Sequence, residues 1–273
     1  MNRLALAILA FSISGQDQEE SAVTTACSTT LAKGFTFSIQ PSSTMFDGLP
    51  KDRAAMIGSA FKGEFANGVF HASDGVYEVY GSNGRVAIRG AGEGWLPMDR
   101  FLAPIRQEIA QGFTGERWNR GNVTKARKAV QQAIQIAHLV HRGNPDWLQN
   151  VGGAFKELKR VGVRKVDGKD AVEVEGDLTD FAAYRLVQGP LEELVKRGTL
   201  VFQNVSGVGE ILLQDGTVRL LHGRVGAKYS IYLEEDNTRR KGLGVLDVVV
   251  QITRVGETAV DVPKEVAQIL ETK

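Results

Sequence analysis

A single cysteine, Cys27, and four histidines are all that the 273 residues offer for thiol and imidazole chemistry. One cysteine forms no intramolecular disulfide and no zinc site made of several thiolates. A charge of one sign is also lacking, because 33 Lys and Arg stand against 32 Asp and Glu. Without a basic excess, no overall field draws the chain onto nucleic acid. We therefore expect no nucleic-acid partner, no metal and no cofactor.

Long hydrophobic runs are missing as well. A helix needs about 20 apolar residues to span a bilayer, and the apolar run at residues 4–13 has ten. It follows Arg3 and contains or precedes the small residues Ser12 and Ser14, an order typical of secretory signal peptides. We predict a signal peptide over residues 1–15 and export to the periplasm. Release from the cell and an ordinary buried N-terminal helix are the alternatives.

The segment that follows is polar. Residues 16–30 are rich in Ser, Thr, Gln and Glu, a composition typical of flexible segments. We predict a flexible leader there and a single domain over residues 31–273. Cys27 follows the small residue Ala26, as lipid-attachment cysteines do, but a polar, acidic stretch separates it from the apolar run. The sequence favours an unmodified thiol and leaves acylation open.

Glycine, by contrast, is abundant, with 31 residues, six of them directly after Asn or Asp. Both central residues of a type I′ turn have positive φ, so Asn-Gly and Asp-Gly favour two-residue β-hairpins. We predict a β-meander up to residue 90, a hairpin over residues 161–174 and four or five strands after residue 200. The flanking segments alternate apolar and polar residues around turns at residues 67–68, 83–84, 167–168 and 215–216.

Residues 98–159 show helical spacing instead. Gly143 ends the clearest helix, and Asn144 and Pro145 begin a second one, which we predict to reach Leu158. A third helix is predicted from Thr179 to residue 196. One side of the clearest helix, at residues 124–141, carries six residues at the 3.6-residue period: Ala126, Val130, Ala133, Ile134, Ala137 and His141.

This order of elements predicts an α+β fold. A sheet of about ten twisted antiparallel strands tends to curl. We predict a curved antiparallel β-sheet, an incomplete barrel, with inserted helices covering its concave face. Such a shape leaves room for a cavity between the sheet and the helices.

Five features together are similar to a known family. They are the export signal, the meander from Gly68 to Arg89, the central helical block, the hairpin of residues 166–174 with Gly176 after it, and the terminal segment 260–263. Their order resembles the LolA and LolB outer-membrane lipoprotein carriers and the LppX and LprG type of lipid-binding lipoproteins. The resemblance implies an incomplete β-barrel, closed by helices around an apolar cavity for acyl chains. It implies a lipid or a lipoprotein acyl chain as the ligand.

Apolar side chains in and before the helical block are the candidates for the lining or lid of this cavity. The alternative is ordinary core packing, since any helix that lies on a sheet needs an apolar stripe. The candidate ligand-binding residues are Trp95, Phe101, Ile105, Trp147, Leu148 and Phe155.

The sequence gives little support for a catalytic site. His138 and His141 are three residues apart, a spacing that suits either one metal ion or the carbonyls at a helix C-terminus. No Ser, His and Asp arrangement matches a catalytic motif, so we expect no catalytic residues and no enzyme. Basic groups at residues 117–128, 156–165 and 239–241 are expected to be solvated, or one of them to meet an anionic head group at the cavity rim.

These observations predict an exported, soluble, monomeric binding protein for a lipid or an acylated protein. Trafficking of envelope lipids or lipoproteins, with transient contact to a membrane-associated partner, is the expected role. The alternative is a non-enzymatic envelope scaffold or protein-interaction module with a packed interior. A hydrolase that uses His138 or His141 is the least favoured hypothesis.

Overall fold

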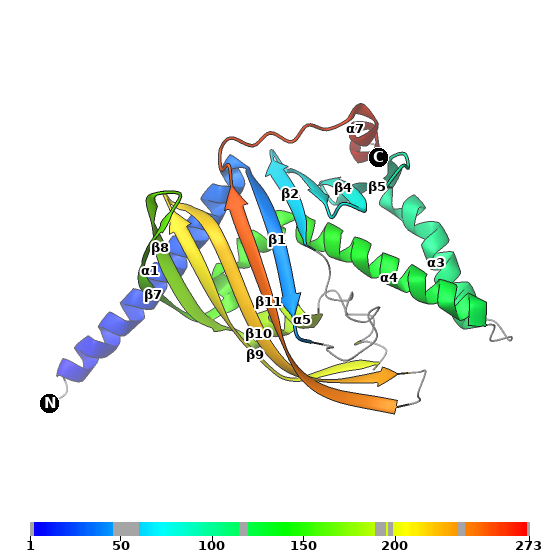
Figure 1. Ribbon diagram of the computed structural model, residues 1–273. Coiled ribbons are helices and arrows are strands. Elements are labelled where there is room, and N and C mark those ends of the chain that lie inside the picture. The colour runs from blue at the N-terminus through cyan, green and yellow to red at the C-terminus, as the bar shows by residue number, and fades with distance from the viewer. Residues whose placement is uncertain are drawn as a thin grey trace.

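One antiparallel sheet organises the molecule (Figure 1). The computed structural model describes residues 3–45, 60–114, 120–188, 195, 199–233 and 238–271. Within these ranges, eleven strands pair in the order β6-β5-β4-β3-β2-β1-β11-β10-β9-β8-β7. Neighbours in the sheet are also neighbours in the chain, except that β1 pairs with β11. This described sheet is open, with β6 and β7 at its two ends, and it confirms the predicted α+β class.

The strands fall into two groups on either side of a helical block. Their bounds are β1 Phe35–Ser43, β2 Phe61–Ala66, β3 Val69–Ser73, β4 Tyr77–Ser82, β5 Arg85–Gly90, β6 Leu96–Pro97, β7 Phe155–Val166, β8 Lys169–Leu178, β9 Leu200–Gln214, β10 Thr217–Leu233 and β11 Thr238–Thr253.

Helices cover one face of the sheet, which we call the inner face; the opposite one is the outer face. Figure 1 shows α4 and α5 behind the strands, and α1, α4 and α5 all contact strands. The helical elements are α1 Arg3–Lys33, α3 Met98–Thr114, α4 Arg120–Gly143, the 3₁₀ turns η2 Pro145–Asn150 and η3 Gly152–Ala154, α5 Asp180–Gln188 and α7 Lys264–Glu271.

The main core lies between the inner face and these helices. Side chains in a strand point alternately to opposite faces, and Phe35, Phe37 and Ile39 of β1 are accordingly buried on the inner side. Phe37 pairs with Ile252 of β11, and both belong to the same core as Ile136 of α4. The core therefore joins the first strand, the last strand and the helical block.

The predicted hairpin turns are confirmed. Asn83 and Gly84 have φ of 51° and 77°, and Asp167 and Gly168 have φ of 49° and 79°. Positive φ at both central residues is what a type I′ turn requires. Asp215 and residues 67–68 have the same signs, so these dipeptides place four hairpins of the sheet.

Residues 16–30 are helical, although their composition predicts a flexible leader. They belong to α1, whose residues Val23, Ala26, Cys27 and Thr30 are buried. Their spacing of three and four residues makes one face of a helix. Thr30 ties this face to the sheet, because its Oγ1 accepts a hydrogen bond from the Val218 backbone N–H at 2.9 Å. Burial of this face outweighs the polar composition.

The second predicted helix is not formed. Residues 145–150 and 152–154 make two 3₁₀ turns, and Phe155 already begins β7. Asn144 caps the first turn as predicted, accepting from the Asp146 backbone N–H at 3.3 Å. Beyond the turns, pairing with β8 supplies the backbone hydrogen bonds of β7, so tertiary pairing overrides the helical spacing.

The helix α4 is present, and its buried side overlaps the predicted one only in part, since Ala126 is buried as predicted. Ile136, His138 and Leu139 are buried, while Ala137 and His141 are exposed. Burying large aliphatic side chains contributes more than burying alanine, so the helix turns Ile136 and Leu139 to the sheet. The two histidines therefore face different surroundings.

The third predicted helix begins as expected. Thr179 accepts from the Ala182 backbone N–H at 3.2 Å and caps α5, as its residue type favours. Its predicted continuation at residues 189–194 and 196 lies outside the described residues. None of the helices described is both long and apolar enough to cross a membrane.

Candidate ligand-binding site

The structure distributes the six predicted ligand-binding residues along the sheet. Phe101 and Ile105 of α3 and Leu148 of η2 are buried in the main core, and Trp147 and Phe155 pack against it. The Trp147 Nε1–H donates to the Arg142 carbonyl at 3.0 Å. These five residues share one core, and their role toward a ligand stays a prediction.

Trp95 lies apart from the other five. Its ring contacts Tyr80 at 5.2 Å between centroids, and the Arg89 guanidinium lies 4.6 Å above it. Tyr80 forms a small second core with Ala87 and with Val266 of α7, and its hydroxyl donates to the Asp261 carbonyl at 3.1 Å. Because Tyr80 lies on the outer face, Trp95 packs under the C-terminal segment rather than over the main core.

An open pocket of about 420 Å³ lies between α5 and β9. We call it the α5 groove. The rings of Tyr184 and Phe202 meet edge to face at 6.5 Å, and Phe181 is 73% exposed. Two elements that are not adjacent in the chain therefore supply one aromatic surface. The groove is lined by Asp180, Phe181, Tyr184, Phe202, Gln203, Asn204 and Val205.

The floor of the α5 groove is continuous with the main core. Phe202 is buried and belongs to that core, and Tyr184 and Val205 pack against it. Phe155 belongs to the same packed set, and a Cβ on Gly209 of β9 would lie 2.7 Å from its ring. One of the predicted ligand-binding residues is thus packed on the strand that lines the groove.

Charged groups stand at the rim of the α5 groove. The Lys156 ammonium donates to Asp180 at 2.7 Å, and this hydrogen bond raises the pKa of Lys156. The Arg185 guanidinium lies 5.5 Å from the centroid of the Phe181 ring. Lys156 and Asp180 thus pair with each other. Arg185 is a second cation, and it lies beside the exposed ring of Phe181.

Sequence reasoning missed the α5 groove. Phe181 and Tyr184 were expected on an ordinary helix, and Phe202 and Val205 on an ordinary strand. Their three-residue spacing at 181 and 184 does place them on one helix side. No local pattern shows which distant strand lies beneath that side, so only the fold brings the two segments together.

A second pocket, of about 500 Å³, lies on the outer face beside the end strand β7. Val161 and Val208 are half exposed there. We call it the outer hollow; none of the six predicted residues lines it or the α5 groove. Its lining is Glu157, Lys159, Val161, Glu175, Gly176, Asp177, Val208, Gly209, Glu210, His222 and Arg224.

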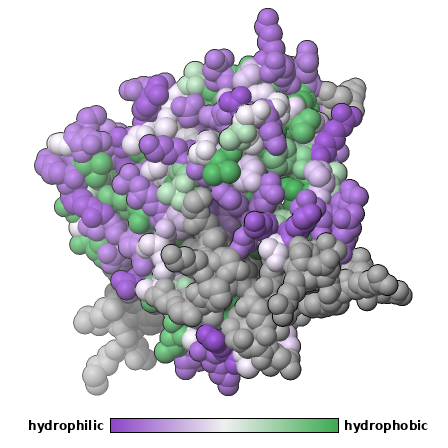
Figure 2. Space-filling model, turned by 45° about the vertical axis from the view of Figure 1, so that its right-hand side comes forward, coloured by the Kyte–Doolittle hydropathy of each residue, from purple (hydrophilic) through white to green (hydrophobic). Residues whose placement is uncertain are grey.

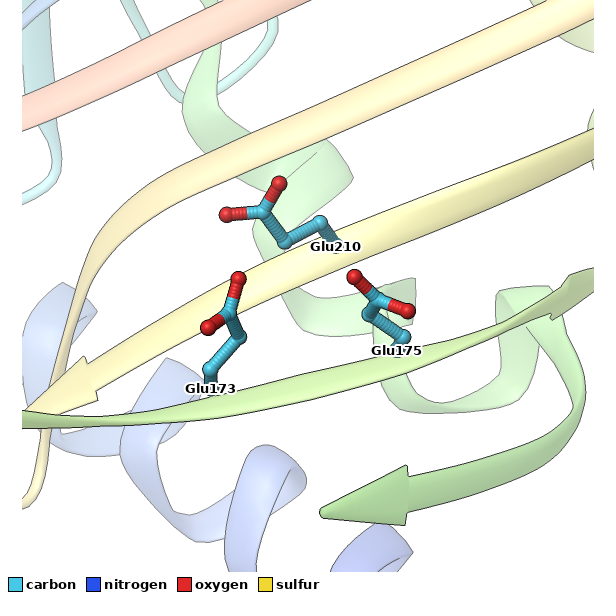
Figure 3. Close-up of side chains that lie close together, drawn as sticks. All are labelled: Glu173, Glu175 and Glu210. Carbon is cyan, nitrogen blue, oxygen red and sulfur yellow. The ribbon is translucent and has the colours of Figure 1, made fainter. Parts of the chain in front are cut away.

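Three carboxylates gather at the outer hollow (Figure 3). Glu173 and Glu175 of β8 and Glu210 of β9 have oxygens within 4.8 Å of one another. Such oxygens are the donors that hard cations take. The Arg164 guanidinium already pairs with Glu210 and lies 3.9 Å from Glu173. His222 Nδ1 lies 3.7 Å from Glu210, so an ion-pair network connects these strands.

The hydrophobic residues on the visible surface lie in small, separate groups. Figure 2 shows small groups of hydrophobic residues between hydrophilic ones on one face of the molecule. Phe181 and Leu243 are the most exposed large apolar residues described, at 73% and 72%. Isolated apolar residues are ordinary on a surface, whereas Phe181 borders a groove with further aromatic rings.

Cys27 offers no accessible thiol. It is 1% exposed inside the buried face of α1, and burial raises the pKa of its thiol from 9.0 to about 12. The thiolate is the reactive form of cysteine. The packing favours the predicted unmodified thiol.

We expect the Cys27 thiol to react with DTNB at pH 8 about a thousandfold more slowly in the folded protein than in urea, from the thiolate fractions alone. The folded rate should rise as the pH rises toward the raised pKa of about 12, because the thiolate then accumulates. Absorbance of the released thiol measures both rates. Equal rates in buffer and in urea would contradict the buried position.

Comparisons with known proteins are limited to structure. No protein-family profile matches the chain, and no curated protein matches it. The fold is similar to lipoprotein LppX of Mycobacterium tuberculosis, with a TM-score of 0.44 and 8% identity, covering 88% of this chain and 96% of LppX. It is also similar to LprF of Mycobacterium bovis, with a TM-score of 0.42 and 9% identity, covering 92% of this chain and 98% of LprF.

Proposed function

We propose that this protein is an exported binding protein that holds the acyl chain of a lipid in the α5 groove. The observation that carries the proposal is the aromatic lining formed by Phe181, Tyr184 and Phe202. Phe181 remains 73% exposed although Phe202, across the groove, is buried. An apolar ligand that lies along the groove would cover the exposed ring and extend the core outward.

The size of the α5 groove suits one acyl chain. Its volume of about 420 Å³ falls in the range of roughly 300–1,000 Å³ that is usual for small-molecule sites. Burial of each methylene contributes about 0.8 kcal/mol, so eight methylenes contribute about 6 kcal/mol before the costs of association. The polar side chains Gln203 and Asn204 at the rim suit a polar head group outside.

Export is part of the proposal. Arg3 and the apolar residues 4–13 have the order of a secretory signal. Removal of residues 1–15 would leave the buried residues Val23, Ala26, Cys27 and Thr30 of α1 in the chain. We propose that the mature protein works in the periplasm and carries lipid between membrane-associated partners.

Binding of palmitic acid, followed by isothermal titration calorimetry and by native mass spectrometry, tests the proposal. We expect a 1:1 complex, and about tenfold weaker binding after Phe181→Ala, which corresponds to the loss of about 1.4 kcal/mol of apolar contact. Because Phe181 is mostly exposed, the variant should keep its free energy of unfolding.

Leu243→Ala is the matched control. Leu243 is 72% exposed, close to the value for Phe181, but it lies on the outer face of β11, since the inner positions Leu246 and Val248 are buried. We expect its affinity to equal that of the unaltered protein. A protein that binds no palmitate, or a Phe181→Ala variant with unchanged affinity, would rule out this groove as the site.

A protein-interaction module is the second candidate. The specific observation that favours it is the end strand β7, which has one strand neighbour in the described sheet and half-exposed Val161 and Val163. Unpaired strand edges accept strands of other chains. Failure to bind palmitate, with a partner held through β7, would support this function over lipid binding.

A further inference from the structure

We propose that the lipid held in the α5 groove has an anionic head group, a carboxylate or a phosphate, and that Arg185 binds it. This inference rests on the proposed function, because it assigns the head group of the same ligand. The juxtaposition that carries it is a guanidinium 5.5 Å from the ring of Phe181, which itself lines the groove.

Arg185 is placed at the groove by the helix. It follows Phe181 by four residues in α5, and side chains at i and i+4 of a helix are neighbours. The guanidinium therefore stays on the side of α5 that carries the groove. An Arg stacked on an aromatic ring keeps the N–H groups at its edge free to donate.

The charge of Arg185 is not neutralised by a described acidic partner. None of the carboxylates in the described residues forms an ion pair with Arg185, whereas the other cation at the rim, Lys156, contacts Asp180 at 2.7 Å. The aromatic lining of the groove therefore lies beside one guanidinium that forms no ion pair with a described carboxylate.

The head-group chemistry follows from the geometry of the guanidinium. Its planar pairs of N–H donors match two oxygens of one carboxylate or phosphate. The acyl chain would lie over Tyr184 and Phe202, and the anionic oxygens would accept hydrogen bonds from Arg185. The same arrangement offers a neutral hydroxyl head group no charge partner, so affinity should distinguish the two.

Three single-chain probes of equal length test the inference: palmitate, hexadecyl phosphate and hexadecanol, each below the concentration at which it aggregates. We expect the unaltered protein to bind the two anions about tenfold more tightly than hexadecanol. Arg185→Gln should remove this preference and leave hexadecanol binding unchanged. Raising the salt concentration should reduce the preference, because Arg185 is exposed and exposed charges are screened.

Arg100→Gln is the control, since Arg100 is an exposed arginine of α3, and we expect it to keep the preference. Palmitate and hexadecyl phosphate together show which anion the site prefers; tighter binding of either one meets the expectation. Equal affinity for all three probes, or a preference that survives Arg185→Gln, would overturn the inference while lipid binding stands. Binding of none of them would overturn the proposed function itself.

Discussion

Val23→Asp is expected to lower the free energy of unfolding by about 4 kcal/mol, the cost of an unpaired buried charge. Val23 is 0% exposed and belongs to the main core. Cys27, one helical turn further on, is also buried, so the aspartate would lie among apolar atoms with no water to solvate it. Urea unfolding followed by circular dichroism measures the change.

Ala22→Asp provides the control on the same helix. Ala22 is exposed and directly precedes Val23, so its aspartate remains in water and should change the free energy of unfolding by less than about 0.5 kcal/mol. The composition of residues 16–30 predicts a flexible leader, in which both substitutions would be equally harmless. Equal effects of the two substitutions would therefore support a flexible leader and contradict the packing of α1 in the core.

Gly81→Val should be the second most damaging substitution, with a loss of about 3 kcal/mol, because inserted carbon atoms strain a packed core. A Cβ at Gly81 of β4 would overlap the ring of Phe70 on β3. The ring is buried in the main core, so moving it away would displace other buried side chains. Thermal and urea unfolding report the loss.

Gly226→Val is the matched control in the same sheet. A Cβ at Gly226 of β10 meets no atom within 4 Å, so we expect little change in stability. Phe70→Leu, combined with Gly81→Val, should recover part of the loss, because the two side chains share one volume. A Gly81→Val protein as stable as the Gly226→Val protein would show that the contact of Phe70 with β4 does not limit packing.

The antiparallel sheet was predictable because its signals are local. A turn such as Asn83-Gly84 depends on φ at two adjacent residues, and the alternation of Phe35, Phe37 and Ile39 needs only the period of one strand. Both features appear in the structure. The α+β class could be inferred from these local patterns alone.

Helical segments were less predictable because their spacing competes with tertiary contacts. The predicted side of α4 includes the buried Ala126, but it also includes Ala137 and His141, which are exposed, and it leaves out the buried Ile136 and Leu139. Phe155 and Leu158 fit a helical spacing, yet this segment pairs with β8 and forms a strand. In each case, burial or strand pairing adds more free energy than helix propensity, which is a weak preference.

The candidate site was beyond sequence reasoning for a related reason. The predicted set of six residues is apolar, and five of them are in or on the main core, where apolarity serves packing equally well. The α5 groove instead joins Phe181 and Tyr184 with Phe202. Arg185 can be recognised as a candidate binding residue only from its position beside the exposed ring of Phe181.

The amino-acid sequence by itself determined the hairpins, the alternating strands and hence the antiparallel sheet of this protein, because each depends on residues adjacent in the chain. Only the tertiary structure decided that residues 16–30 form a helix, that β7 is a strand and that α5 lies over β9. These outcomes depend on which distant surfaces are buried together. The lone cysteine depends on both: its count excludes an intramolecular disulfide, while its burial in α1 raises the pKa of its thiol and predicts slow reaction.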